Sequence, residues 1–148
     1  MNANWANKLY IGTAYTPGSG SSAGTWTYKQ LCAGIEGMEF NINEQNQQFF
    51  FLCGGGFATN EVTGAAPEIS VSGRRIVGDD AQDYVVSKQF ALGDDRKTSV
   101  KIEAEGKQII CDATLGDIQS FGGQALDVNA FGCTIRLNGT PTMTDINA

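Results

Sequence analysis

The sequence of 148 residues contains no histidine. Histidine is the general base of most Ser–His and Cys–His catalytic pairs and the commonest zinc ligand. Its absence excludes those enzymes and every zinc site that needs an imidazole. No other residue set forms a catalytic constellation, so we expect no enzyme activity, no metal and no cofactor.

Basic charge and long apolar runs are also scarce. Ten Lys and Arg residues stand against 16 Asp and Glu residues, which gives a net charge of −6 and no basic stripe for nucleic acid. The longest apolar run, 49–58, is too short to span a bilayer, and the first residues lack a signal-peptide pattern. We expect a soluble protein made in the cytoplasm, without a membrane partner.

The four cysteines form no C-x-x-C pair, which disfavours a zinc ribbon or a redox motif. Each lies in an apolar or alternating context, and a domain of this size does not need disulfide bonds. We therefore expect all four to be small core residues: Cys32, Cys53, Cys111 and Cys133.

Alternation of apolar and polar residues is the main pattern in the chain. In 98–106, Val100 and Ile102 share one face while Lys101 and Glu103 share the other, as in a half-buried antiparallel strand. Similar strands are expected within the segments 8–15, 25–32, 37–43, 67–78, 107–118 and 131–141. The short link at 105–107 predicts a hairpin between two of them.

These elements predict a mainly β fold. We expect one domain over 1–148, a β-sandwich or partly open barrel of antiparallel strands with one inserted α-helix at about 79–92. Composition predicts flexible loops near 16–24 and 54–66 and a C-terminal arm at 142–148.

The predicted helix carries an aspartate pair at each end, in DDAQDYVVSKQFALGDDRKT (79–98). Asp79 fits an N-cap with Gln82 at the third helical position, and Gly93 fits the residue after the C-cap. A straight helix would hold the two acidic ends roughly 22 Å apart, too far to share a metal ion. We interpret the aspartates as helix caps.

One stretch without charge predicts assembly. Between Glu44 and Glu61 only Cys53 is ionisable, and the strand within this stretch reads NQQFFFLC. Such a segment must be buried in a core or paired with another chain, and both alternatives are open at this point. The candidate inter-subunit residues are Gln47, Phe49, Phe50, Phe51, Arg74 and Arg75.

From residue 67 to 141 the chain resembles the major tail protein, or tail-tube protein, of long-tailed, siphovirus-type bacteriophages. The similar motifs are SVSGRR, GDDAQDYVVSKQF, ALGDDRKT and FGCTIRLNGTPT. The resemblance implies a structural virion protein, found in the phage tail and assembled in the host cytoplasm. Six copies would close into a ring, and rings would stack into the hollow tube that conducts DNA during ejection.

The resemblance also implies partners for such a tube. These are further copies of the chain, the tape-measure protein, the tail terminator, and baseplate or distal tail proteins. Double-stranded DNA would pass through the lumen without specific binding, which suits an acidic wall. The candidate lumen residues are Glu103, Glu105, Asp112, Asp117 and Asp127.

Other functions remain open from the sequence. The chain could be a capsid decoration protein, or the tube of a contractile tail or tailocin. A small ligand-binding sandwich would use Trp5, Trp26 and Tyr28 as a stacking platform. A carboxylate-dependent hydrolase or nuclease is disfavoured, because no acidic set converges.

Overall fold

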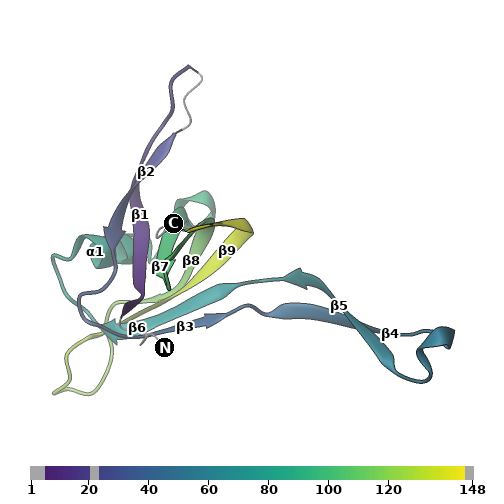
Figure 1. Cartoon of the computed structure of the whole chain (residues 1–148). Helices are drawn as coiled ribbons and strands as arrows, with labels where there is room; N and C mark the ends of the chain where they lie inside the picture. Colours follow the sequence, from purple (N-terminus) through teal and green to yellow (C-terminus); the bar gives the residue numbers. More distant parts are fainter. Residues whose placement is uncertain (1–5, 21–23, 146–148) are drawn as a thin grey trace.

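The computed structural model describes residues 6–20 and 24–145 (Figure 1). This part of the chain forms a large antiparallel sheet, a separate two-stranded ribbon and one α-helix, α1 (Asp80–Ser87). The strands are β1 (Lys8–Thr16), β2 (Thr25–Gln30), β3 (Ile35–Asn41), β4 (Glu44–Phe50), β5 (Ala58–Ala65), β6 (Glu68–Arg74), β7 (Lys97–Ala104), β8 (Lys107–Gln119) and β9 (Ala130–Asp145). Two 3₁₀ turns, η2 (Leu52–Gly54) and η3 (Gly93–Arg96), complete the elements used below.

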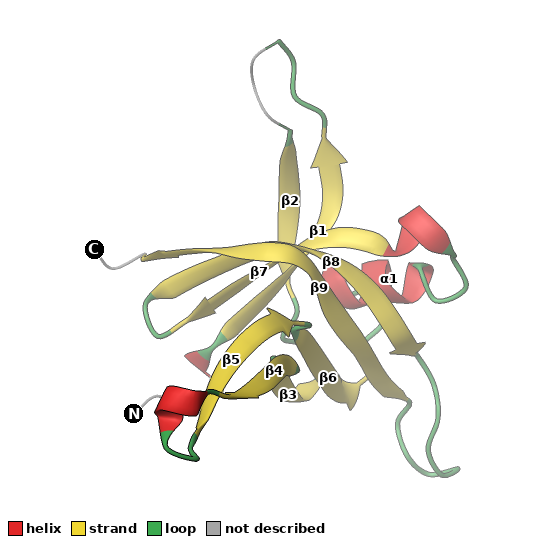
Figure 2. Ribbon diagram, turned by 90° about the vertical axis from the view of Figure 1, so that its right-hand side faces the viewer, coloured by secondary structure: helices red, strands yellow, loops and turns green. Residues whose placement is uncertain are grey.

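The large sheet has seven strands in the order β2-β1-β7-β8-β9-β6-β3, and all its pairings are antiparallel. It curls without closing, because the edge strands β2 and β3 do not pair with each other in the described structure. Figure 2 shows the curled strands with α1 beside them, and α1 contacts β1, β2 and β8. The predicted mainly β fold with one inserted helix is therefore confirmed.

The core lies on the inner face of this curl. Alternating residues such as Val100 on β7, Cys111 on β8 and Ile135 on β9 point inward and are at most 5% exposed. The strictly alternating sequence of β7 produces this arrangement, because every second side chain of a strand lies on the same face. The β7–β8 hairpin turns at Glu105 and Gly106, both at positive φ, as a two-residue turn of the I′ class requires.

The helix is shorter than the sequence predicts. Asp79 is its N-cap, and the Asp79 carboxylate accepts a hydrogen bond from the backbone N–H of Gln82 at 3.2 Å. The helix ends at Ser87, so its predicted extension to residue 92 is wrong, and Gly93 does not follow the C-cap. Gly93 instead starts the η3 turn with a φ of 65°.

The side chain of Arg96, from the η3 turn that follows, accounts for this early end. The Arg96 guanidinium donates to the carbonyl oxygens of Gln89 at 2.6 Å and Ala91 at 2.9 Å. These carbonyls lie beyond the end of α1, and a third bond to the Leu115 carbonyl ties them to β8. The chain therefore turns back toward the sheet where local propensity alone would continue the helix.

The cysteines divide into two classes. Cys111 and Cys133 are buried as predicted, whereas Cys32 and Cys53 are exposed, so their assignment to the core is wrong. Cys32 follows Leu31, which takes the buried position at the end of β2, and Cys53 lies in the η2 turn. Burial raises the pKa of Cys133 to about 12 and raises the pKa of Cys111 above its usual range.

We expect two of the four thiols to react with Ellman's reagent in the native monomer at pH 8. Cys32 and Cys53 should react at once because they are exposed, and the two buried thiols should react only after denaturation. Counting released thiolate before and after adding guanidinium chloride measures this. Four fast thiols in the native protein would contradict the placement of β8 and β9.

Two segments predicted to be flexible are strands. Most of 54–66 is β5, which pairs with β4. An alternation of apolar and polar residues did not reveal this strand, because neither face of the β4–β5 ribbon is buried. Residues 142–145 belong to β9 and pair with β8, so the predicted C-terminal arm is wrong for them, and 146–148 lie outside the described residues. Within 16–24, residues 17–20 and 24 connect β1 to β2, and 21–23 also lie outside the description.

No helix in the described ranges is long and apolar enough to cross a membrane.

Candidate assembly surfaces

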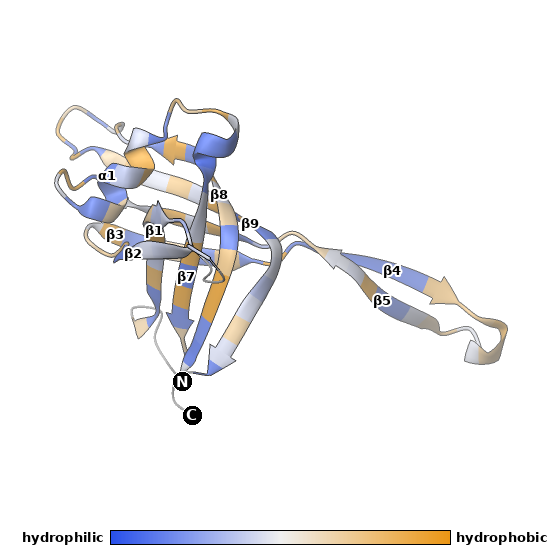
Figure 3. Cartoon of the chain, turned by 90° about the horizontal axis from the view of Figure 1, so that it is seen from above, coloured by the Kyte–Doolittle hydropathy of each residue, from blue (hydrophilic) through white to orange (hydrophobic). Residues whose placement is uncertain are grey.

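The β4–β5 ribbon, residues 44–65, is an arm that projects from the body (Figures 1 and 3). None of its residues is buried, although it carries large apolar side chains. Phe50 is 70% exposed, Leu52 104% and Phe57 81%. Figure 3 shows β4 changing from hydrophilic near the body to hydrophobic at its far end. In a single chain this apolar tip has no core to enter.

Both faces of the arm carry phenylalanine. Phe49 and Phe51 lie on one face with Gln47 and stack with ring centroids 6.0 Å apart. Phe50 lies on the opposite face with Val62, which is 60% exposed. The arm therefore offers apolar area to partners on two sides, and the four arm residues predicted as inter-subunit contacts lie together here.

The two predicted basic contacts lie elsewhere. Arg74 is exposed and pairs with Glu36 on β3 at 2.7 Å. Arg75 has a side chain only 12% exposed, because it donates to Asp83 on α1 at 2.7 Å and to the backbone carbonyl of Ile76. Arg75 holds the helix to the sheet, so only Arg74 is placed to contact another chain.

Asp83 gives this pairing a pH dependence. The hydrogen bond from Arg75 lowers the pKa of the Asp83 carboxyl below its usual range. A lowered folded-state pKa contributes stability that is full above the unfolded value of about 3.9 and disappears as the pH falls through the folded value. We expect Asp83→Asn to destabilise the protein at pH 7, and the difference from wild type to shrink at an acidic pH where the folded-state carboxyl is protonated. Urea unfolding at both pH values measures it, and an equal difference at both would contradict the ion pair.

The candidate lumen acids do not form one cluster. Glu103 on β7 and Asp112 on β8 share the outer face of the sheet, opposite the core. Glu105 lies in the β7–β8 turn, and Asp117 pairs with Arg136 at 3.0 Å. Asp127 accepts from the backbone N–H of Gln124 within the loop before β9.

Three of the four aspartates in the two pairs of the sequence have structural partners. Besides the cap at Asp79, Asp80 pairs with Lys29 of β2 at 3.7 Å, and Asp94 pairs with Lys97 at 2.9 Å. No group of three Cys, Asp or Glu side chains gathers as a metal-ligand set among the residues described.

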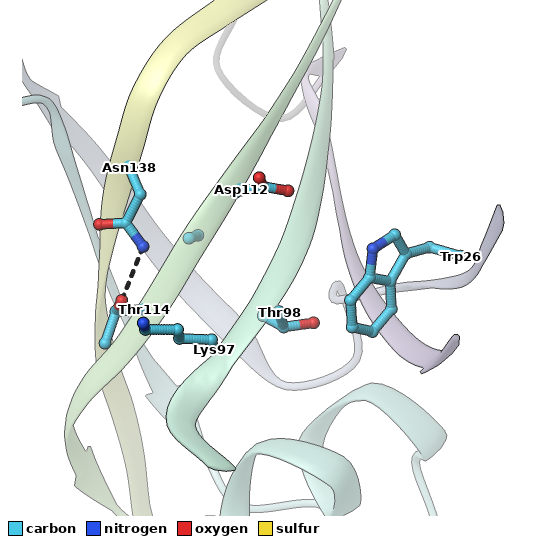
Figure 4. Close-up of a pocket in the computed structure, with 7 residues that line it drawn as sticks. Trp26, Lys97, Thr98, Asp112, Thr114 and Asn138 are labelled. Atoms are coloured by element: carbon cyan, nitrogen blue, oxygen red, sulfur yellow. Dashed lines mark hydrogen bonds between the residues drawn. The ribbon is translucent and has the colours of Figure 1, made fainter. Parts of the chain in front are cut away.

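An open depression of about 460 Å³ lies on the outer face between β2 and β9 (Figure 4). Trp26 lines one side, and Thr114 and Asn138, joined by a 2.8 Å hydrogen bond, line the other. This is where the predicted stacking platform would lie, although Trp5 falls outside the described residues.

The platform is already occupied by internal contacts. Lys101 lies over the rings of Tyr10 and Tyr28, and the Tyr28 hydroxyl is 2.9 Å from that of Ser99. Trp26 packs against Tyr15 with ring centroids 5.1 Å apart. The geometry favours a structural role for these aromatics over sugar stacking.

The sequence reasoning missed two further exposed apolar groups. One lies in the segments flanking α1 and the other in the loop between β8 and β9. The sequence held a signal only for the second group, whose large apolar residues stand in a segment without strand or helix periodicity. The first group falls in segments assigned above to a strand and to the helix, which hid its exposure. The residues are Val77, Phe90 and Leu92 in the first group, and Phe121, Leu126 and Val128 in the second.

No family model and no curated protein matches this sequence. Eleven chains of solved structures match. One is from the tail of an empty gene transfer agent (GTA) particle with C6 symmetry, with a TM-score of 0.66 at 14% identity over 97% of this chain and 98% of that one.

Another match is a chain of the sheath–tube complex of an extracellular contractile injection system, PVC, in the extended state. Its TM-score is 0.53 at 11% identity, over 98% of this chain and 92% of that one. Both similarities extend over nearly the whole chain. The fold is therefore tail-tube-like.

Proposed function

We propose that this chain is the tail-tube protein of a phage-type particle, a structural protein without catalytic function. Its copies form rings, and the rings stack into a hollow tube. The observation that carries the proposal is the exposed apolar arm on a fold that matches a chain of a C6-symmetric tail along nearly its full length. A soluble monomer rarely exposes so much contiguous apolar surface unless it binds a partner.

The C6 symmetry of the structurally similar gene transfer agent tail suggests six copies per ring. The curled sheet leaves β2 and β3 as open edges, and open edges are sites of pairing between chains. The proposal extends to a flexible, siphovirus-type tail in which DNA passes through the lumen and the tape-measure, terminator and baseplate proteins complete the tail. The similarity to a contractile injection system supports a contractile tail or tailocin tube as the second candidate.

Within this function, Glu103 and Asp112 are our candidates for the lumen wall, since they share the outer sheet face. The negative carboxylates would repel the DNA phosphates, and at physiological salt this repulsion acts over a distance of about 8 Å from the wall. A density map of the tube with both carboxylates on its outside would refute this placement.

Negative-stain electron microscopy of the purified protein at high concentration, with light scattering alongside, tests the proposal. We expect hollow tubes or stacked rings with six-fold end views. A capsid decoration protein would give isolated trimers or monomers. A uniform monomer, both alone and with preformed tail ends added as initiators, would refute the tube function.

A further inference from the structure

An apolar pocket lies at one open end of the inner sheet face. The curl brings β3 and β6 opposite β7 and β8, and the buried core of the described residues leaves a space between them. The cavity of about 200 Å³ is lined by the polar Asn7 and otherwise by the apolar residues Met38, Phe40, Ile69, Ile102, Ala104 and Ile109. Ile69 and Ile102 are its buried walls, and Phe40, 58% exposed, stands at its edge.

We propose that this pocket receives the arm tip of a second copy of the chain, with Phe57 as the inserted side chain and Leu52 covering the edge. The inference rests on the proposed function and names the contact that would join the copies. A benzene ring fits a cavity of about 150 Å³, so the pocket has room for one phenyl group. Neither surface has a charge to desolvate: among the described residues no charged side chain lines the cavity, and the segment 45–60 contains no charged residue.

The tip cannot reach the pocket of its own chain. Phe40 at the pocket edge lies near the base of the arm, one residue before the end of β3. The seven residues of β4 extend the tip by about 23 Å at roughly 3.3 Å per residue, and Figures 1 and 3 show the arm leading away from the body. The contact must therefore join two copies.

The available area suits such a contact. Large apolar side chains bury at least roughly 150 Å² each, so Phe50, Leu52 and Phe57 would supply about half of the ~800 Å² per partner of a standard interface. The remaining arm faces can supply the rest. Tip and pocket are different surfaces of one chain, so the contact is head-to-tail and propagates until a ring closes or a filament grows.

Cys53 allows a direct test, because it lies next to Leu52. A backbone hydrogen bond from Gly54 N to Phe51 O, 3.0 Å long, closes the tip turn around it. The test uses the full chain with Cys32→Ser, so that Cys53 is the exposed native thiol. Ala104→Cys then places a thiol in the pocket, and Ser70→Cys places the control thiol on the outer face of β6.

Both variants are treated with a short bismaleimide at assembling concentration. We expect the Ala104→Cys chain to give covalent dimers and ladders of larger oligomers. The Ser70→Cys chain should give neither. Tubes without extra crosslinking at Ala104→Cys would overturn the pocket contact and leave the tube function standing. Crosslinked oligomers without tubes would support the contact between tip and pocket and refute the tail-tube function. A monomer that does not crosslink would refute both proposals.

Two further measurements complete the test. The Ala104→Cys thiol should react with maleimide in the dilute monomer and be protected in tubes. Protection already in the dilute monomer would overturn the proposal. Phe57→Ser should raise the critical concentration for assembly roughly tenfold to a hundredfold, the effect of exposing one large apolar side chain. Asn60→Ser, an exposed polar arm position, should leave it unchanged.

Discussion

Replacing Gln82 with alanine should lower the free energy of unfolding by about 3 kcal/mol or more, because buried polar groups would lose their partners. Gln82 is completely buried at the start of α1. Its amide nitrogen donates to the carbonyls of Ala33 at 2.7 Å and Arg74 at 3.0 Å. Its amide oxygen accepts from the backbone N–H of Ile76 at 2.8 Å and from Arg75 at 3.2 Å.

These four bonds join the turn after β2, the end of β6 and the helix. Their removal takes the side-chain partner from two carbonyls and one N–H that meet at the fully buried Gln82, and each buried group left unpaired costs about 1–3 kcal/mol. Urea unfolding monitored by circular dichroism measures the loss. The effect should appear in the folded monomer, independently of any assembly.

Two controls separate hydrogen bonding from volume. Gln82→Met keeps the volume of the side chain but makes none of the four bonds, so we expect it to show most of the alanine effect. Gln30→Ala, on the exposed edge strand β2, should change the free energy of unfolding by less than about 0.5 kcal/mol. Wild-type stability in Gln82→Met would contradict the bonding network.

The same residue shows where sequence reasoning ends. Position 82 reads as part of a capping box because Asp79 stands three residues earlier, and local chemistry does account for the Asp79 cap. The partner Ala33 is 49 positions away, however, so no local pattern could reveal the network. The early end of α1 also escapes a helix propensity scale, because Arg96 bonds the carbonyls of Gln89 and Ala91 with its side chain and joins them to Leu115 on β8.

Strands that bury one face were predictable from sequence. Val100 and Ile102 alternate with Lys101 and Glu103 because one side of β7 faces the core and the other does not. The arm lacks this signal, because neither of its faces has a core within the chain. The sequence did show an uncharged, phenylalanine-rich strand that needs a partner. Such a strand predicts that an interface exists, but it does not predict which surface of the other chain binds the strand.

Replacing the arm, residues 44–65, with an Asn-Gly turn should abolish assembly and leave the body folded. Asn43 and Ala66 then face each other across a two-residue loop, continuing the register in which Asn41 pairs with Glu68. No buried residue is removed, so we expect the free energy of unfolding to stay within about 1 kcal/mol of wild type. Urea unfolding and sedimentation with electron microscopy measure the two effects. Loss of folding would contradict the separation of arm and body.

The arm-replaced chain should also act on the intact protein. It keeps the sheet edges and the apolar pocket, so it can join a growing assembly, but it offers no tip to the next copy. Added at a small molar fraction to wild type, it should shorten the tubes, whereas the same amount of Asn60→Ser chain should not. Full-length tubes that incorporate the armless chain would show that the body alone forms the lattice, and the arm would then need another partner.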